Sequence, residues 1–196
     1  MEHYFSEKTK TPSDPKRIEL HFDNKSYPFI TDHGVFSRDR LDFGTGLLLK
    51  TSMNSLSGKV LDLGCGYGPV GVLVYLNRGI LCDMVDVNER ALHLAKENLK
   101  LNRAQGEVFY SDGFSATEKA YDTILLNPPI RRGKEIIYGL FEEARHHLAP
   151  EGRLIIVIQK KQGMLSAKKK LEELYENVVI LDKKGGYYVL EARLAV

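Results

Sequence analysis

Gly64, Gly66 and Gly68 follow a short apolar run, and an apolar helical pattern comes directly after them. Glycines at the end of a strand let the backbone turn tightly and approach a ligand without a clash from Cβ. The free amides at the start of the next helix suit a phosphate or the carboxylate of a methionyl group. Because Gly66, Gly68 and Gly71 also fit the dinucleotide pattern G-x-G-x-x-G, the loop by itself does not separate NAD from S-adenosylmethionine.

Acidic residues end or interrupt the neighbouring apolar runs. At the end of the second run, Asp86 can accept hydrogen bonds from both hydroxyls of a ribose, which both cofactors contain. Asp112 ends the third run and can accept from an adenine amino group, with Phe114 beside the ring. Asp62, inside the first run, is expected to support the loop from below. The alternative is structural: the glycines only make a turn, and Asp86 and Asp112 cap helices.

Asn127-Pro128-Pro129 ends a fourth apolar run, so it is expected at the carboxyl edge of a sheet, where open α/β folds bind ligands. Two prolines donate no N–H and hold φ at about −65°, so we expect their carbonyls to be fixed and free to accept. The Asn127 side chain and the Pro128 carbonyl can then hold both hydrogens of a flat exocyclic amine and turn its lone pair toward a methyl sulfonium. No general base or metal is required to start that attack. The alternative is an ordinary strand-ending turn.

Arg131, Arg132 and Lys134 come directly after the two prolines, at the expected mouth of the site. Such side chains can hold the phosphates that flank an extruded nucleotide, which favours an RNA substrate. The alternative is a solvated surface loop, because runs of charge usually face water.

Helical and strand patterns alternate from Leu41 onward, as in α/β proteins. We expect a Rossmann-like, doubly wound sheet of seven strands, mostly parallel with an antiparallel last strand, preceded by an N-terminal β-hairpin at about residues 17–33. Residues 17–196 are predicted to form one domain and residues 1–16 a flexible N-terminus. The predicted strands are 59–64, 80–87, 106–111, 121–127, 153–159, 177–182 and 186–196, and helices are predicted at 46–53, after the glycines, and at 88–102, 134–152 and 166–176.

The composition is that of an ordinary globular protein, with 43% hydrophobic and 28% charged residues among 196. The net charge of +2 allows a nucleic-acid partner without requiring one. No apolar run reaches the roughly 20 residues of a membrane span and the polar start lacks the centre of a secretory signal, so we expect a cytoplasmic protein with no membrane partner. Cys65 and Cys82 form no metal-binding cluster, so neither a metal nor a disulfide is expected.

The segments DLGCGYG, VDV, SDGF and NPPI, in this order, resemble those of class I methyltransferases that modify exocyclic nitrogens. The segment from Gly34 to Gly46 resembles more narrowly the ribosomal RNA small-subunit guanine-N2 methyltransferases, the methyltransferase small domain family. The resemblance spans most of the chain. It implies S-adenosylmethionine as cofactor, S-adenosylhomocysteine as product, and the N2 of a guanine in 16S ribosomal RNA as target, in free RNA or in the small ribosomal subunit. We expect a monomer or a homodimer.

The motifs and the resemblance together assign roles to individual residues. The catalytic segment is Asn127, Pro128 and Pro129, and the substrate is expected to meet Ile130, Arg131, Arg132 and Lys134. The residues expected to hold the cofactor are Phe36, Thr45, Asp62, Gly64, Cys65, Gly66, Gly68, Asp86, Val87, Asp112, Gly113 and Asn127. By the resemblance, Ser37 and the turn Gly44-Thr45-Gly46 also line the pocket. Many members of the family have an aromatic residue after the second proline, to stack on a flipped base, where this chain has Ile130.

Other functions compete with this interpretation. A protein glutamine N5-methyltransferase presents the same kind of flat amine to Asn-Pro-Pro, but a tyrosine in place of Ile130 would have favoured it. An NAD-dependent dehydrogenase leaves the two prolines unexplained and would need a substrate domain. A non-catalytic, S-adenosylmethionine-binding ribosome assembly factor is hinted at by Ile130 alone, and the intact Asn127 argues against it.

Overall fold

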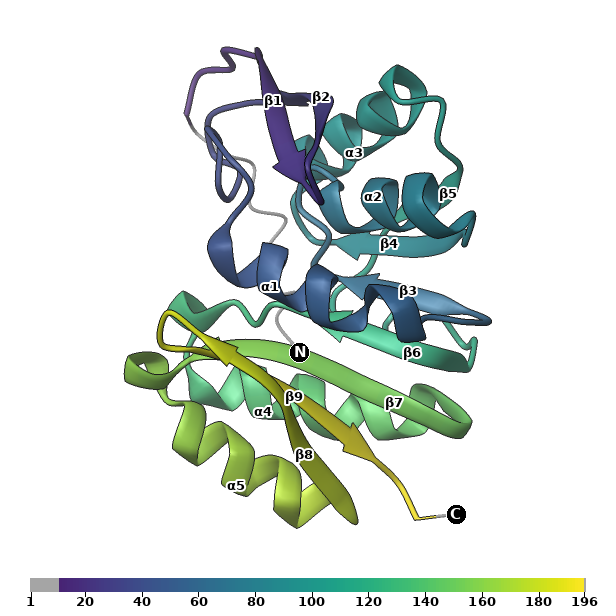
Figure 1. Cartoon of the computed structure of the whole chain (residues 1–196), viewed down its shortest axis with the longest axis vertical. Helices are drawn as coiled ribbons and strands as arrows, with labels where there is room; N and C mark the ends of the chain where they lie inside the picture. Colours follow the sequence, from purple (N-terminus) through teal and green to yellow (C-terminus); the bar gives the residue numbers. More distant parts are fainter. Residues whose placement is uncertain (1–10, 196) are drawn as a thin grey trace.

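A computed structural model of the chain describes residues 11–195. These residues form a seven-stranded sheet of order β5-β4-β3-β6-β7-β9-β8 with helices on both faces (Figure 1). Its strands are β3 (Val60–Leu63), β4 (Cys82–Asp86), β5 (Gly106–Tyr110), β6 (Tyr121–Leu126), β7 (Leu148–Gln159), β8 (Asn177–Lys184) and β9 (Tyr187–Arg193). Neighbouring strands are parallel, except that β9 is antiparallel to both β7 and β8. The predicted Rossmann-like sheet with an antiparallel last strand is confirmed.

The helices cover the two faces of the sheet as separate layers (Figure 1). One layer holds α1 (Phe43–Ser52), α2 (Pro69–Arg78) and α3 (Glu89–Leu101), and the other holds α4 (Lys134–Ala144) and α5 (Met164–Leu174). Val60 packs into the first core, whereas Leu61, the next residue, packs into the second. Strands buried on both faces are expected to read as continuous apolar runs, and this is how they read in the sequence.

The order of the strands reverses at β3, which lies between β4 and β6. Leu63 and Leu126, the last residues of β3 and β6, are partners in the parallel register. The glycine loop and Asn-Pro-Pro therefore begin side by side at the carboxyl edge of the sheet, at the switch point where such folds bind ligands.

The predicted N-terminal hairpin is formed by β1 (Lys16–Phe22) and β2 (Lys25–Thr31), joined by two residues with positive φ. It packs on α3 through Asn98, which is fully buried. The Asn98 side chain accepts from the Ile30 backbone at 2.6 Å and donates to the carbonyls of Ile30, at 2.9 Å, and Tyr67, at 2.8 Å. One buried amide thus ties the hairpin to the glycine loop.

The helix predicted for residues 134–152 is shorter than expected. It ends at Ala144, and after a 3-10 turn, η3 (Arg145–His147), strand β7 already begins at Leu148. The predicted helix-ending residues Pro150 and Gly152 lie inside this strand, where Leu148 pairs with Tyr121. A Cβ on Gly152 would lie 2.7 Å from the Tyr121 carbonyl, so the glycine marks a close approach between strands rather than the end of a helix.

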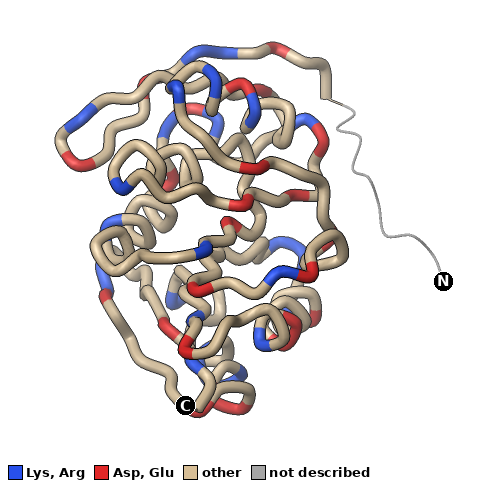
Figure 2. The backbone as a smooth tube through the Cα atoms, turned by 90° about the vertical axis from the view of Figure 1, so that its right-hand side faces the viewer, with Lys and Arg blue, Asp and Glu red and all other residues tan. Residues whose placement is uncertain are grey.

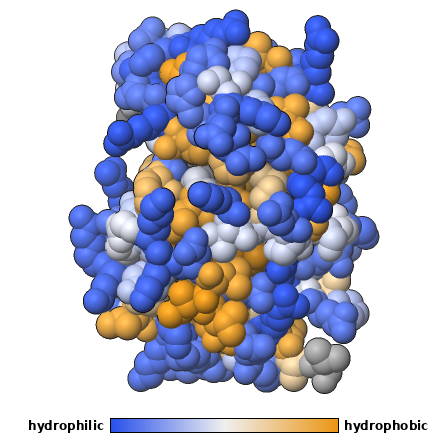
Figure 3. All heavy atoms as spheres, in the orientation of Figure 1, coloured by the Kyte–Doolittle hydropathy of each residue, from blue (hydrophilic) through white to orange (hydrophobic). Residues whose placement is uncertain are grey.

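The last strand in the sheet order lies apart from the carboxyl ends of β3 and β6. This edge strand, β8, exposes Val179, Ile180 and Leu181, and an apolar patch covers the same region in the lower half of Figure 3. The patch is therefore separate from the switch point.

Residues 1–10 of the segment that we predicted to be flexible, 1–16, lie outside the described residues. In the described remainder, the Ser13 hydroxyl and the Asp14 backbone amide each donate to the Asp32 carboxylate at 2.6 Å. Within residues 11–195, no helix combines the length and apolar character that crossing a membrane requires.

Candidate active site

The first two glycines of the loop leave open space above the carboxyl edge of the sheet. Gly64 and Gly66 have φ values of +77° and +55°, and a Cβ on either would meet no atom within 4 Å. The loop is held from behind by β4, because the amides of Gly64 and Cys65 both donate to the Val85 carbonyl at 2.9 Å. The backbone is thus exposed to a ligand where a side chain would block it.

The next two glycines serve packing instead. Gly68 begins α2 with a φ of +93°, and a Cβ there would lie 2.8 Å from Met84 Cε and 3.1 Å from Ala95 Cβ. A Cβ on Gly71 would also collide with Met84. The four glycines therefore form an open pair, Gly64 and Gly66, and a packed pair, Gly68 and Gly71. Gly68, a predicted cofactor residue, belongs to the packed pair.

Asp86 joins the glycine loop to the start of the next helix. Its Oδ2 accepts from the Gly66 amide at 2.8 Å and its Oδ1 accepts from the Asn88 amide at 2.9 Å. The half-buried Val87 follows directly. A carboxylate oxygen has two lone pairs, so each oxygen of Asp86 can accept a further hydrogen bond, as the prediction of ribose binding requires.

Asp62 lies beneath the loop and is 4% exposed. It accepts a hydrogen bond from the Gly71 backbone, but its Oδ2 has no partner among the described residues. Burial raises the pKa of Asp62 to about 7, and the nearby charge of Asp86 adds to the rise. This carboxylate oxygen without a partner is one feature of the site that would favour a positively charged ligand.

Cys65 is buried within the same loop. Burial raises the pKa of its thiol well above the usual range, and the charges of Asp62 and Asp86 act in the same direction. A thiol that stays protonated is a poor nucleophile, so Cys65 packs the loop without chemistry of its own.

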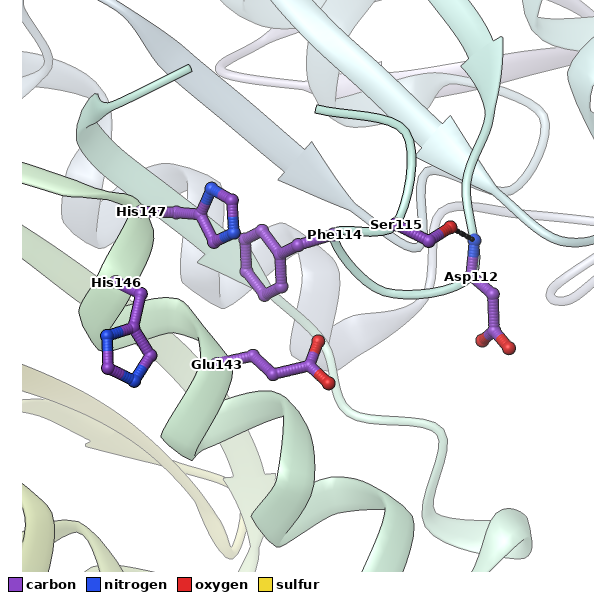
Figure 4. A pocket seen from close by; sticks show the side chains of 6 residues that line it. All are labelled: Asp112, Phe114, Ser115, Glu143, His146 and His147. Carbon is purple, nitrogen blue, oxygen red and sulfur yellow. Dashed lines mark hydrogen bonds between the residues drawn. The ribbon is translucent and has the colours of Figure 1, made fainter. Parts of the chain in front are cut away.

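The end of β5 forms a tight turn around Gly113, which has a φ of +56°. The Ser111 hydroxyl donates to the Gly113 carbonyl at 2.8 Å, and the Asp112 backbone amide donates to the Ser115 hydroxyl at 3.1 Å. The exposed Asp112 carboxylate forms no hydrogen bond with a described residue and remains able to accept one. It lines a hollow of about 290 Å³, together with Phe114, Ser115, Glu143, His146 and His147 (Figure 4).

The Phe114 ring, which we expected beside an adenine, is 4% exposed and packs in the core between the sheet and α4. It stacks on His147, with ring centroids 4.5 Å apart and planes 9° apart (Figure 4). Glu143 and the two histidines of this hollow were not predicted as site residues. Glu143 lies on an amphipathic helix, where an acidic residue carries no distinguishing signal in the sequence.

The Asn127 side chain is held by residues at the start of α1. Asn127 Nδ2 donates to Asp42 Oδ2 at 3.1 Å and to Thr45 Oγ1 at 3.0 Å. Its nitrogen is thereby occupied, and its oxygen remains as an acceptor. Thr45, predicted to contact the cofactor, is 6% exposed and forms hydrogen bonds with Asp42 and Asn127. Asp42 was not among the residues predicted for the site.

The prediction that both proline carbonyls are free to accept is wrong. Pro129 has φ −75° and ψ 76°, which closes an inverse γ-turn in which the Ile130 amide donates to the Pro128 carbonyl at 2.8 Å. The Pro129 carbonyl accepts from the Arg132 amide at 2.9 Å. The Pro128 carbonyl keeps one lone pair for a ligand, so Asn127 carries more of the expected recognition than the prolines do.

The segment before α1 lies next to the glycine loop. The Tyr67 hydroxyl donates to the Ser37 carbonyl at 3.2 Å, whereas the side chain of Phe36 is 65% exposed. Burial raises the pKa of Tyr67, and the charge of Asp42 contributes to the rise. The structure thus brings the segment 36–45 and the loop together, with Phe36 exposed on the surface.

The basic residues after Asn-Pro-Pro are exposed. Arg131 and Arg132 lie in a 3-10 turn, η2 (Ile130–Arg132), and Lys134 begins α4, while Ile130 is half-buried against the core. In the view of Figure 2, basic and acidic positions are interspersed along the backbone. The three cations after Asn-Pro-Pro are a local cluster that follows β6.

Carboxylates dominate the site itself. Asp62 and Asp86 flank the glycine loop and Asp42 contacts Asn127, and within residues 11–195 none of the three forms an ion pair with Lys or Arg. A diphosphate would bring further negative charge among them, whereas a sulfonium and an ammonium would be attracted. The residues present fit S-adenosylmethionine better than NAD, a choice that the glycine loop by itself leaves open.

No group of three or more metal-binding side chains (His, Cys, Asp or Glu) with the arrangement of a metal site occurs in the part of the chain that the structure describes.

The comparisons with known proteins agree on one family. A family model described as methyltransferase small domain matches residues 26–191. An uncharacterized protein of Bacillus subtilis, YbxB, is 43% identical over 98% of each chain. Ribosomal RNA small subunit methyltransferase C of Aliivibrio fischeri is 34% identical, over 91% of this chain and 53% of its own.

Among solved structures, the Thermus thermophilus 16S rRNA N2 G1207 methyltransferase, in complex with AdoMet and guanosine, superposes with a TM-score of 0.84 at 26% identity. The match covers 94% of this chain and 52% of that one. The chain thus spans about half the length of the named rRNA methyltransferases that it matches and nearly the full length of YbxB.

Proposed function

Because the chain belongs to the methyltransferase small domain family, we propose that it transfers a methyl group from S-adenosylmethionine to the exocyclic N2 of a guanine in 16S ribosomal RNA. The observation that carries the proposal is the Asn127 amide, whose nitrogen is bonded to Asp42 and Thr45 so that its oxygen is left to accept. This acceptor follows β6, beside the open glycine loop that follows β3.

The cofactor, when bound, would supply a methyl group from its sulfonium, and the thioether that remains would be the leaving group of the reaction. The residues around the loop can hold it: the backbone at Gly64 and Gly66 leaves it room, and Asp86 keeps lone pairs for ribose hydroxyls. The unpaired Asp62 oxygen and the Asp86 carboxylate make this edge of the sheet electrostatically suited to a cation.

The amine is activated by orientation. Asn127 Oδ1 and the remaining lone pair of the Pro128 carbonyl accept its two hydrogens, so that the nitrogen lone pair points toward the methyl carbon. With the cofactor bound, the N–C bond would form as the C–S bond breaks, and the electron pair of the C–S bond would stay on sulfur. The methylated nitrogen then loses one proton to water, so no protein base is needed.

The guanine target is supported by the rRNA methyltransferases that the chain resembles. The exposed Arg131, Arg132 and Lys134 are placed to hold phosphates beside the flipped nucleotide, and Ile130 packs against the base where an aromatic ring would stack in other members. A substrate in ribosomal RNA or in the small subunit would require the protein to act in the cytoplasm.

The test is methyl transfer from radiolabelled S-adenosylmethionine to naked 16S RNA, to assembled small subunits and to a release factor. We expect label in RNA as N2-methylguanine, and a loss of about a hundredfold or more in rate for Asn127→Ala with cofactor affinity retained. Asn54→Ala is the matched control, because Asn54 is exposed and follows α1 at the other edge of the sheet.

Label on the release factor instead would make the protein a glutamine methyltransferase. Tight binding of S-adenosylmethionine without label on any acceptor would favour a non-catalytic assembly factor.

A further inference from the structure

Two residues at the start of α1 determine how the Asn127 side chain is turned. Asn127 Nδ2 lies 3.1 Å from Asp42 Oδ2 and 3.0 Å from Thr45 Oγ1. We propose that Asp42 and Thr45 are positioning residues, which hold the Asn127 amide with its oxygen toward the amine that is methylated. The inference deepens the proposed function and rests on it for the identity of that amine.

The direction of each hydrogen bond follows from which atoms can donate. The Asp42 carboxylate only accepts, so the Thr45 hydroxyl, 3.2 Å away, gives it its single hydrogen. Thr45 Oγ1 must then accept from Asn127, and the two hydrogens of the Asn127 amide meet two acceptors. Turning the amide by half a rotation would place its oxygen against the Asp42 carboxylate, so the network admits one orientation.

The start of α1 is itself fixed in place. Asp42 Oδ2 also caps the helix by accepting from the Thr45 backbone amide at 2.9 Å. A Cβ on Gly44 would lie 3.0 Å from the Tyr187 ring and 3.1 Å from Asp42 Oδ2, so a larger residue there would have to displace the ring or the carboxylate. The helix cap and the network thus share one carboxylate oxygen.

The orientation matters because an exocyclic amine presents hydrogens to its binding site. The Asn127 oxygen can hold one of them, whereas a flipped amide would set its own hydrogens against those of the amine. Without the network the amide is free to rotate between these states. We therefore expect loss of the network to slow methyl transfer on the order of ten- to a hundredfold without weakening the binding of the cofactor.

The kinetic test compares Thr45→Val with Thr45→Ser. Valine keeps the shape of the side chain and the backbone cap by Asp42 but removes the hydroxyl, whereas serine restores the hydroxyl. We expect Thr45→Val to lower kcat at least about tenfold with unchanged affinity for S-adenosylmethionine, and Thr45→Ser to recover most of the rate. A loss that appears only in cofactor affinity would overturn the proposal and make Thr45 a cofactor contact.

The same substitution in an Asn127→Ala background separates positioning from a direct role. If Thr45 acts through Asn127, Thr45→Val has no further effect on kcat once the amide is gone. Effects that multiply in the double variant would show that Thr45 acts independently of Asn127, against the proposal.

A measurement without substrate tests the network by itself. In a ¹H–¹⁵N spectrum, the side-chain amide of Asn127 is assigned by its disappearance in Asn127→Ala, and its exchange with water is expected to be slow and to speed up in Thr45→Val. Asp42→Ser, which keeps a capping oxygen but cannot reach Asn127, should have the same effect. If neither substitution changes the exchange of the Asn127 signal, the network is refuted. If both speed it up, the network is supported. Either result holds whether or not the proposed RNA substrate is correct.

Discussion

The glycine loop after β3 and the Asn-Pro-Pro step after β6 begin on adjacent strands but are built differently. The loop takes its shape from its own glycines and from the neighbouring strand, where the Gly64 amide donates to the Val85 carbonyl. The Asn127 amide takes its orientation from Asp42 and Thr45, which are 85 and 82 residues away in the chain. The cofactor side of the site is therefore a local motif, whereas the amine side is assembled by the tertiary fold.

The two sides also differ in how completely their carboxylates are hydrogen-bonded. Asp42 Oδ2 accepts from the backbone and hydroxyl of Thr45 and from Asn127. Asp62 Oδ2 accepts from no described residue. Because an unpaired buried carboxylate destabilises the fold, the cofactor side is held at a cost in stability, whereas the amine side is already ordered without a ligand.

The largest expected effect tests this cost at Asp62. Because the pKa of Asp62 in the folded protein, about 7, lies above the usual value of 3.8 for an aspartate in the unfolded chain, the folded protein retains a proton that the unfolded chain releases. The contribution to stability is full below the unfolded pKa and is lost as the pH rises through the folded pKa. Urea unfolding without cofactor should show the protein losing about 2–3 kcal/mol, relative to Asp62→Asn, between pH 5 and pH 8.

The comparison with Asp62→Asn removes the contribution of the histidines, which titrate in the same range in both proteins. Parallel pH profiles of stability for the two proteins would show that the pKa of Asp62 is not raised in the folded protein, and the proposed difference between the two sides would fail. Saturating S-adenosylmethionine should reduce the pH dependence, since a cation near the loop favours the ionised carboxylate.

A smaller effect is expected from the glycines, and it sharpens the assignment of the open space. Gly66 and Gly79 have φ values of +55° and +66°, and a Cβ on either meets nothing within 4 Å, but Gly79 ends α2 away from the loop. Alanine at either position should lower the free energy of unfolding by about 1–2 kcal/mol through the same backbone strain. Only Gly66→Ala should also weaken S-adenosylmethionine binding, at least about tenfold by titration calorimetry. Equal affinities in the two variants would mean that the space above Gly66 is not the cofactor site.

The local character of the loop explains why the sequence predicted that side well. Closely spaced glycines after an apolar run, followed by an acidic residue at the next strand end, form a local pattern with a defined geometry, and Asp86 lies where this pattern placed it. The pattern did not show that Gly68 and Gly71 face Met84, because that depends on how α2 packs against β4.

The amine side was predicted only in part, for the corresponding physical reason. Asn127 was identified from its position after a strand, but its partners lie in a distant segment, and pairing across such a distance leaves no periodic signal. The N-cap pattern Asp42-x-x-Thr45 was available, yet helix α1 was expected to begin at Gly46, after both residues. The γ-turn at Pro129 was likewise hidden, because its ψ of 76° is not fixed by the ring.

The smallest expected effect concerns how far the amine side extends outward. If the exposed Arg131 holds one phosphate of the RNA, Arg131→Ala should weaken RNA binding several-fold. It should also reduce the magnitude of the slope of log affinity against log salt by about one, as expected for one lost phosphate contact. Lys96→Ala is the matched control, since Lys96 is an exposed cation on α3, and it should leave the salt slope unchanged. Binding of S-adenosylmethionine should be the same in both, because the phosphate contact lies beyond Asn127 and not at the glycine loop. An equal loss of RNA affinity in the two variants would assign the effect to net charge alone, so that only Asn127 and its partners would define the amine side.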